Sequence, residues 1–393
     1  MQPDNRYAVI IVGAGPAGIS TALHLQRYDP GLAARTLILE KGRHPRPKLC
    51  GGGVLPDGEY ILRDLRLNIT EVPHYDVEWA HFDYNGKGMC MRGEKDGNLA
   101  FRTIRRHEFD AWLAKKAANR GIEIREGVTV KSVKAQGDWV TVETNSVEFT
   151  AQVVVGADGS KGIVRKSVVR DEPSHVARLL EIVTEPKPEQ SCHIQTDSYF
   201  DFYMVPQGIS GYVWDFPALE QGRPVRVRGI YDSNIRPVAS QVSLRAGLAE
   251  EFRRHGLNLD NYKLEGHPIR WFEAGSAFSA MHILLVGDAA GSDALCGEGI
   301  SFALGYGAIA ARAIQDAFNR NDFSFQGYKA SILRSEMGRA LRWRTWLARL
   351  FYSLRSRRIQ ALLWHKLGTV IEWILRLVAI GWAEREQKKN LAS

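Results

Sequence analysis

Cysteine is scarce in this chain of 393 residues, and no two cysteines lie close together in the sequence. The four are Cys50, Cys90, Cys192 and Cys296, so there is no CxxC motif. This spacing gives neither a zinc framework nor a dense disulfide scaffold, and we expect no metal site. A reducing cytoplasm is the simplest setting for such a chain.

Long apolar runs, targeting signals and repeats are missing as well. No segment has the length and purity of a membrane-spanning helix, and Asp4 and Arg6 lead directly into a strand pattern without a signal peptide. The net charge of +8 permits attraction to phosphate groups or anionic membrane. No dedicated nucleic-acid module accompanies that charge, so we expect no nucleic-acid partner.

The first 40 residues predict a βαβ unit of the Rossmann type. Residues 7–12, "YAVIIV", form a buried strand pattern, a glycine-rich turn and a helical pattern follow, and residues 36–40 form a second strand. In the turn, Gly13 permits a tight bend, Gly15 lets a pyrophosphate approach the backbone, and Gly18 allows close helix–strand packing. Glu40 ends the second strand, where an acid can bind a ribose hydroxyl.

Two later turns separate FAD from NAD as the cofactor. "ADGS" contains Asp158 and Gly159, and "GDAAG" begins with Gly287 and Asp288. With the glycine motif and in this order, they resemble the para-hydroxybenzoate-hydroxylase-like superfamily of FAD-dependent oxidoreductases. The resemblance implies that Asp288 binds the ribityl or ribose portion of FAD and that Asp158 organises its turn. It also implies that Arg106, in "RRHEFDAWL", reaches the central portion of the cofactor.

Three narrower stretches resemble the geranylgeranyl reductase family. They are "KLCGGG" at 48–53, "YVWDFP" at 212–217 and "GDAAGSDALCGEGISFAL" at 287–304. Such enzymes saturate isoprenoid double bonds in lipid biosynthesis. The resemblance implies a hydride from reduced FAD on one alkene carbon and a proton on the other, with NAD(P)H or another external reductant as electron donor.

The resemblance also explains three consecutive glycines. Gly51, Gly52 and Gly53 would lie beside the flavin and substrate, where any Cβ would occlude the reacting face, so Cys50, Gly51 and Gly52 are the candidate catalytic residues. The Cys50 thiol is an admissible proton donor at neutral pH. The alternative is a small buried hydrophobe in a structural loop.

The remaining FAD contacts follow from the same resemblance. Gly297 and Gly299 open a helix whose positive N-terminus would face the flavin N1/C2 edge. The loop before them has Ala294 where related loops have proline, and we expect alanine to leave that loop looser. Further contacts are implied for Ala17, Lys41, Val130 and Ile300.

Aromatic residues alternate along one predicted strand. Tyr212, Trp214 and Phe216 share one face, either as the inner side of a packed sheet or as the wall of an apolar substrate tunnel. We favour the tunnel, because burial of apolar area, at about 25 cal/mol per Å², is how a hydrocarbon substrate binds.

The last 60 or so residues predict helices rich in tryptophan and arginine. Two interpretations remain open: a helical cap with solvated arginines, or an interfacial surface on anionic lipid. Glu372 and Arg376 form a favourable i,i+4 pair that argues against a membrane span. We therefore expect a cytoplasmic protein, with the inner membrane face as a further location.

Together these features predict an α/β (α+β) protein. It comprises a discontinuous Rossmann-type FAD-binding domain, an antiparallel-sheet substrate domain and a helical C-terminal region. The predicted FAD-binding domain covers 1–72, 98–170 and 278–330, the substrate domain covers 73–97 and 171–277, and the helical region covers 331–393.

The predicted function is reduction of C=C bonds in an isoprenoid chain. One rival is a flavin-dependent monooxygenase or halogenase acting on a hydrophobic or aromatic substrate, although "YVWDFP" only partly resembles the halogenase signature WxWxIP. A second rival is a non-catalytic lipid- or nucleic-acid-binding flavoprotein, suggested by the basic tail. Oxygen consumption coupled to hydroxylation would favour the first rival.

Overall fold

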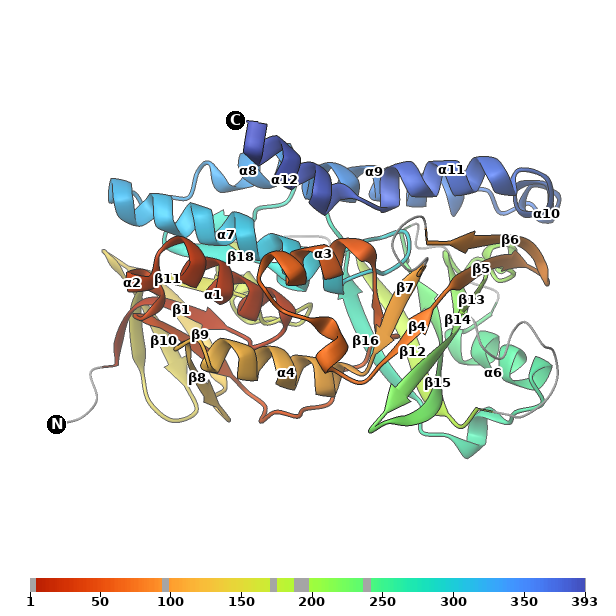
Figure 1. Ribbon diagram of the computed structural model, residues 1–393, viewed down its shortest axis with the longest axis horizontal. Coiled ribbons are helices and arrows are strands. Elements are labelled where there is room, and N and C mark those ends of the chain that lie inside the picture. Colours follow the sequence, from red (N-terminus) through yellow and green to blue (C-terminus); the bar gives the residue numbers. More distant parts are fainter. Residues whose placement is uncertain (1–4, 94–98, 170–174, 187–197, 236–241, 393) are drawn as a thin grey trace.

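The computed structural model describes residues 5–93, 99–169, 175–186, 198–235 and 242–392. Two large β-sheets lie side by side along the long axis, and the C-terminal helices run along one side of both (Figure 1). This arrangement confirms the predicted mixed α/β class with a helical tail. Cys192 lies outside the described residues.

The first sheet has eight strands and a parallel centre. β1 (Arg6–Val12) pairs in parallel with β2 and β11, and its residues from Ala8 onward are buried, which explains the continuous apolar run. The order is β17-β18-β11-β1-β2-β8, and β10 and β9 continue antiparallel from β11. The other strands are β2 (Thr36–Glu40), β8 (Glu123–Glu126), β9 (Val130–Gln136), β10 (Trp139–Thr144), β11 (Phe149–Gly156), β17 (Ser279–Ala280) and β18 (Ile283–Leu285).

Helices α1 (Pro16–Tyr28) and α7 (Ile300–Arg320) pack closely against each other beside this sheet. Small residues make the approach possible: a Cβ on Gly307 would lie 2.3 Å from Ser20 Oγ, which itself donates to the carbonyl of Leu304 at 2.6 Å. The other helices of this half are α2 (Pro30–Ala33), α3 (Pro56–Asp64), α4 (Arg106–Ala118), α5 (Arg165–Val168) and α8 (Tyr328–Arg334).

The second sheet has seven strands in the order β16-β12-β15-β14-β13-β5-β6. Its pairs are antiparallel, as expected, except that β13 and β5 run parallel. Its strands are β5 (Trp79–Tyr84), β6 (Lys87–Arg92), β12 (Val176–Thr184), β13 (Ser198–Asp201), β14 (Gly211–Glu220), β15 (Arg223–Asp232) and β16 (Glu265–Arg270). A third, three-stranded sheet consists of β3 (Gly53–Val54), β4 (His74–Val77) and β7 (Phe101–Ile104).

Helix α6 (Leu244–Arg254) interrupts the region predicted as the antiparallel-sheet domain. Ser243 caps it, because its hydroxyl accepts the amide of Ala246 at 3.1 Å. The helix packs on β12 and β15. Short 3₁₀ turns complete the chain: η1 (Ile69–Glu71), η2 (Val205–Gln207), η3 (Leu259–Asn261) and η4 (Gly287–Ala289).

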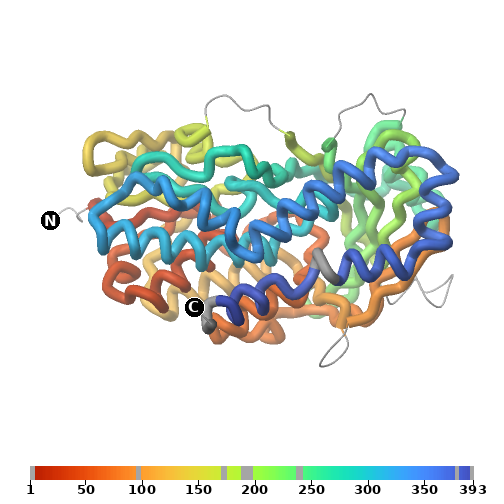
Figure 2. The backbone as a smooth tube through the Cα atoms, turned by 90° about the horizontal axis from the view of Figure 1, so that it is seen from above, coloured from red at the N-terminus to blue at the C-terminus, as the bar shows by residue number. Residues whose placement is uncertain are grey.

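The C-terminal helices cross the molecule and return, as Figure 2 shows from above. They are α9 (Glu336–Phe351), α10 (Arg357–Lys366), α11 (Gly368–Ala379) and α12 (Trp382–Ala392). α10 packs on β5 and β6, and α12 packs on α3 and α9. Trp364 stacks on Phe202 and Trp382 stacks on Phe302, so one side of the tail forms a packed cap. Among the described helices, none is long and apolar enough to span a membrane.

Two hydrophobic cores follow the two large sheets. One lies around the first sheet with α1 and α7, and the other lies under the second sheet with α9 and α10. The domain boundaries given above stay a prediction. Those boundaries would place the two cores in separate domains that the tail joins.

Candidate functional site

One cavity of about 2050 Å³ opens between the two large sheets. It takes in nearly all of the predicted site residues, although they come from segments far apart in the chain. Only Gly18 and Gly287 of the predicted set lie outside its lining. The predicted residues that line it are Gly13, Gly15, Ala17, Glu40, Lys41, Cys50, Gly51, Gly52, Arg106, Val130, Asp158, Gly159, Tyr212, Trp214, Phe216, Asp288, Gly297, Gly299 and Ile300.

The three glycines after β1 are glycine for different reasons. A Cβ on Gly13, whose φ is +108°, would lie 2.4 Å from the carbonyl oxygen of Ala157, and one on Gly18 would lie 2.0 Å from the carbonyl oxygen of Gly13. At Gly15, which caps the N-terminus of α1, the nearest atom to a Cβ is 3.8 Å away on Arg46. Close packing therefore explains the glycines at 13 and 18. Gly15 instead leaves an open space at the N-terminus of α1 that suits a phosphate, and we call this space the glycine cradle.

Glu40 faces this cradle as a buried, ionised acceptor. Its carboxylate accepts the amides of Ala14 and Gly42, both at 2.9 Å, and the guanidinium of Arg46 at 3.1 Å. Burial acts to raise the pKa of Glu40, but Arg46 and the two amides bring it below the usual value. Arg46, which also lies 3.3 Å from Asp110, was missed in the sequence because no motif includes it.

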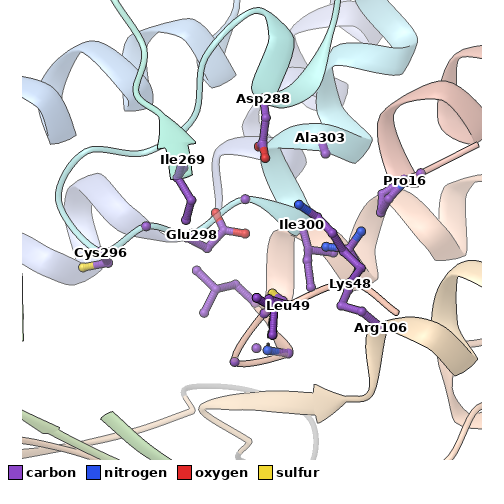
Figure 3. A pocket seen from close by; sticks show the side chains of 18 of the residues that line it. Pro16, Lys48, Leu49, Arg106, Ile269, Asp288, Cys296, Glu298, Ile300 and Ala303 are labelled. Carbon is purple, nitrogen blue, oxygen red and sulfur yellow. Dashed lines mark hydrogen bonds between the residues drawn. The ribbon is translucent and has the colours of Figure 1, made fainter. Parts of the chain in front are cut away.

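The two Asp-Gly motifs meet across the cavity. Asp158 accepts the amide of Val164 at 3.0 Å and so organises its own turn. Ser160 Oγ, in the same turn, donates to Asp288 Oδ2 at 3.4 Å. Gly159 has φ +78° and no atom within 4 Å of where its Cβ would lie. Asp288 points into the space that Glu298 faces from another loop (Figure 3).

Two basic side chains, the buried Arg106 and the half-buried Lys48, lie on another side of this space. Lys48 and Arg106 lie side by side there (Figure 3). Arg106 donates from Nε and Nη2 to Asp110 at 2.8 and 3.0 Å, and Lys48 Nζ donates to His267 Nε2 at 2.5 Å. Burial lowers the pKa of Lys48, whereas the nearby Asp288 carboxylate raises it. Burial and the Lys48 charge together lower the pKa of His267 to about 3, so the ring is a neutral acceptor. Lys48 was overlooked although it begins the quoted "KLCGGG" stretch.

The loop before α7 is held by side chains rather than by proline. Asp293 accepts the amides of Leu295 at 2.8 Å and Cys296 at 3.0 Å. Arg344 of α9, only 2% exposed, donates to Asp293 at 2.8 Å. These contacts hold the loop around Ala294, and a looser loop at this alanine stays a prediction. The tail thereby reaches the candidate site, which the sequence pattern did not reveal.

The glycines of "KLCGGG" also differ from one another. A Cβ on Gly51 would lie 3.0 Å from the Phe216 ring, at the aromatic wall of the cavity. Gly52 has φ +82°, and its Cβ would lie 2.0 Å from the carbonyl oxygen of Ile104. A Cβ on Gly53 would make an ordinary 3.5 Å contact with Phe101. Close contact with the aromatic side chains is thus a reason for glycine at 51, the protein backbone accounts for Gly52, and an open reacting face at these residues stays a prediction.

Cys50 lies between this backbone and a buried acid. Its Sγ accepts the amide of Gly52 at 3.4 Å, and its own amide donates to Glu181 Oε1 at 3.4 Å. Burial raises the pKa of the Cys50 thiol, while Arg106 lowers it and Glu181 raises it further. The thiol is therefore protonated at neutral pH.

The aromatic strand lines the cavity and also packs on its neighbours. Tyr212, Trp214 and Phe216 are buried on one face of β14, and Phe200 packs against Tyr212 and Phe216 with ring centroids 5.3 and 4.9 Å apart. The Tyr212 hydroxyl donates to the carbonyl of Cys296 at 2.5 Å. This face therefore packs within the sheet and also borders the cavity, and its role as the wall of a substrate tunnel stays a prediction.

The family comparison agrees with this geometry. The sequence profile of the FAD binding domain family matches residues 6–291. The chain belongs to this family. The open cradle at Gly15 and the ionised Glu40 suit the diphosphate and ribose of FAD, so the predicted cofactor fits residues that are present. The chain is an FAD-dependent oxidoreductase.

Relatives give a narrower resemblance. The digeranylgeranylglycerophospholipid reductase of Thermoplasma volcanium is 28% identical over 350 residues, which cover 81% of each chain. The crystal structure of a geranylgeranyl bacteriochlorophyll reductase-like protein from Thermoplasma acidophilum superposes with a TM-score of 0.78 at 22% identity, covering 97% of this chain and 95% of that one. A structure of the halogenase PltM gives a TM-score of 0.70 at 16% identity, covering 94% and 82%. These findings confirm the resemblance to geranylgeranyl reductases, and the two structures show the shared fold.

Proposed function

We propose that the enzyme reduces C=C bonds in the isoprenoid chain of a lipid. The observation that carries this proposal is the position of the aromatic wall. Trp214 and Phe216 lie beside Gly51 in the same cavity as the glycine cradle and Asp288, so a hydrocarbon chain against the wall would lie near the cofactor site. The relatives named as reductases of geranylgeranyl lipids support the same substrate class.

FAD, once bound and reduced, supplies the hydride for such a reaction. The residues of the protein itself would hold the cofactor and the substrate, exclude water and supply a proton. Gly13 to Gly18 and Glu40 would hold the dinucleotide, Asp288 the ribityl portion, and the N-terminus of α7 at Gly299 the flavin edge. The aromatic wall would exclude water from the alkene. Cys50, a half-buried thiol, and Gly51 would border the reacting carbons.

The electron donor would be NAD(P)H or another external reductant. A second GxGxxG motif is absent from the sequence, so a nicotinamide would bind transiently rather than in a dinucleotide fold of its own. The positive end of α7 would stabilise negative charge on the reduced flavin and favour its reduction.

We further propose that the tail contacts membrane. Six residues of α9 share one exposed face, and Trp373 of α11 is 64% exposed while also lining the cavity. Tryptophan with arginine on one helical face suits an interface with anionic lipid. We call this surface the Trp/Arg face; it consists of Arg339, Arg342, Trp343, Trp346, Arg349, Leu350, Val370 and Trp373. A substrate dissolved in membrane would enter beside it.

An anaerobic experiment tests the reaction. The purified protein is reduced, mixed with geranylgeranyl lipids, and followed by the absorbance of oxidised flavin and the mass of the lipid. We expect reoxidation together with a gain of two mass units for each bond reduced. Reoxidation only in the presence of O₂, with hydroxylated or halogenated product, would instead identify the monooxygenase or halogenase alternative. Reduced flavin that persists with every lipid would favour a non-catalytic flavoprotein.

A further inference from the structure

Glu181 is a buried acid in the wall of the cavity that no sequence motif contains. It lies on β12, where Leu179, Glu181 and Val183 alternate toward the cavity. Its side chain is 1% exposed. A carboxyl group so deeply buried is costly unless it is fully bonded or used.

The bonding of this carboxyl group is incomplete. Oε1 accepts the amide of Cys50 at 3.4 Å, and Oε2 is buried without a hydrogen-bond partner among the described residues. Arg105 Nη1 is the nearest ion-pair partner, at 4.0 Å, and that guanidinium also lies 3.3 Å from Glu220. Glu181 is therefore neither neutralised by a close cation nor saturated with donors.

Other acids of the cavity form hydrogen bonds that stabilise the fold. Glu40 accepts two amides and Arg46. Glu298 accepts the amide of Ser301 at 2.8 Å, at the start of α7, and its second oxygen lies 3.8 Å from Arg344. Glu298 Oε2 likewise has no hydrogen-bond partner among the described residues, but of these three acids it is Glu181 that is bonded to the amide of Cys50.

We propose that Glu181 is the proton donor of the reduction, an inference that rests on the proposed function. Reduction of a C=C bond breaks the π bond and forms two C–H bonds, one from a hydride that reduced FAD supplies and one from a proton. The proton leaves Glu181 Oε2 for the carbon that does not receive the hydride. The resulting carboxylate regains a proton from water, and the two electrons come from the external reductant that reduces FAD.

The charge environment suits this role. Burial raises the pKa of Glu181 to about 7, because it outweighs the charge of Arg105 and the Cys50 amide, which lower the pKa. Glu265, its cross-strand neighbour on β16, raises the pKa, and Lys48 lowers it. The group therefore gives up and regains a proton near neutral pH, where a general acid is most effective.

The first test measures flavin reoxidation by a geranylgeranyl lipid under anaerobic conditions as a function of pH. The wild-type rate is expected to fall as pH rises through about 7. Glu181→Gln should slow reoxidation about 100-fold or more and abolish this alkaline limb, because general acids typically contribute 10²–10⁴-fold. Glu181→Asp should recover part of the rate. FAD content and reduction by dithionite should stay unchanged.

Two further variants serve as comparators. Glu185→Gln changes an exposed acid just beyond the same strand, outside the cavity, and should leave the profile as in the wild type. Glu298→Gln changes the acid of the cavity that most resembles Glu181, because its Oε2 also lacks a hydrogen-bond partner among the described residues and burial raises its pKa to about 7. A wild-type rate in Glu181→Gln, or loss of the alkaline limb in Glu298→Gln instead, overturns the assignment to Glu181 while leaving the proposed function intact. Absence of reoxidation in the wild type overturns both.

A second readout uses the FAD-free protein and needs no turnover. The pKa of Glu181 in the folded protein, about 7, lies above the ordinary glutamate pKa of 4.5, so its contribution to the stability of the folded state is present at low pH and is lost as pH rises from 4.5 through 7. Thermal midpoints should therefore fall more steeply over this range in the wild type than in Glu181→Gln. Parallel curves would show that the carboxyl group does not titrate near neutrality and would contradict the proposal.

Discussion

At the scale of single residues, the glycine triplet shows that one sequence signal can combine unrelated constraints. Gly51 lies against the aromatic wall, Gly52 lies against the backbone of Ile104, and Gly53 tolerates a Cβ. A run of three glycines indicates that the main chain is crowded, but it does not reveal what crowds each position. Only the three-dimensional contacts separate a ligand-facing glycine from a packed one.

Gly52→Ala should therefore damage folding rather than catalysis. The substitution adds a Cβ at 2.0 Å from the Ile104 carbonyl oxygen in a backbone with φ +82°. Positive φ alone costs a non-glycine residue roughly 1–2 kcal/mol, and the clash adds to that cost. We expect a clearly lower thermal midpoint, measured by circular dichroism. Gly53→Ala, whose Cβ makes an ordinary contact, is the matched control, and equal midpoints for both variants would refute the packing argument.

Cys50→Ser tests whether the thiol takes part in the reaction. Serine keeps the amide bond to Glu181 but replaces a weakly bonded thiol that borders the proposed reacting carbons. We expect a fall in turnover of about 10-fold or more with normal flavin content, because a hydroxyl is smaller and less acidic than the thiol that lies beside the proposed proton donor Glu181. Cys90→Ser, at an exposed position outside the cavity, is the control. Loss of bound flavin in Cys50→Ser would identify Cys50 as structural instead.

Residues with a motif were predictable, and residues without one were not. Gly15, Glu40 and Asp288 follow buried strands at fixed offsets, so local sequence identifies them. Glu181 and Lys48 reach the cavity only because β12, β16 and the 45–53 segment converge in space. Nothing in the local pattern around them signals that convergence, since a lone acid in a strand is usually surface-exposed.

At the scale of elements, helix α9 both covers the hydrophobic core and holds the loop before α7. The sequence predicts its amphipathic spacing, and the exposed side bears Trp343 and Trp346 as that spacing requires. Arg344 points the opposite way and ties the helix to Asp293 in the loop before α7. An arginine among many in a basic helix gives no sign that it is the buried one. The helix was predictable, whereas its link to the site was not.

Arg344→Met should consequently destabilise the loop before α7 and so weaken the binding of FAD. Removing one partner of a buried ion pair leaves Asp293 uncompensated and typically costs about 3–5 kcal/mol. We expect a lower thermal midpoint and weaker FAD retention, measured by fluorescence of flavin released on dilution. Arg342→Met, on the exposed side of the same helix, should change neither. If Arg344→Met retained wild-type stability and FAD affinity, α9 would be no more than a cover.

At the scale of the whole molecule, the helices and strands were easier to predict than their assembly. The Rossmann strands, the antiparallel sheet and the helical tail all carry periodic patterns, and the structure contains them. Their assembly places the cavity between the two large sheets, with Trp373 of the returning tail among the residues that line it. That return depends on contacts such as Trp382 with Phe302, between residues 80 positions apart (382 − 302), which no periodicity encodes.

From the surface that the tail exposes, we expect the protein to bind anionic vesicles. The Trp/Arg face places basic and aromatic side chains on one surface, and each basic residue near an anionic bilayer contributes about 1 kcal/mol. The protein should therefore sediment with phosphatidylglycerol vesicles, less so with phosphatidylcholine vesicles, and less at high salt. Trp343→Ser/Trp346→Ser should weaken binding several-fold without changing FAD content. A matched pair, Val147→Ser/Met281→Ser, removes exposed apolar side chains elsewhere and should leave binding intact. Equal binding by both double variants would mean that basic charge alone, and not the inserted tryptophans, holds the protein at the lipid surface.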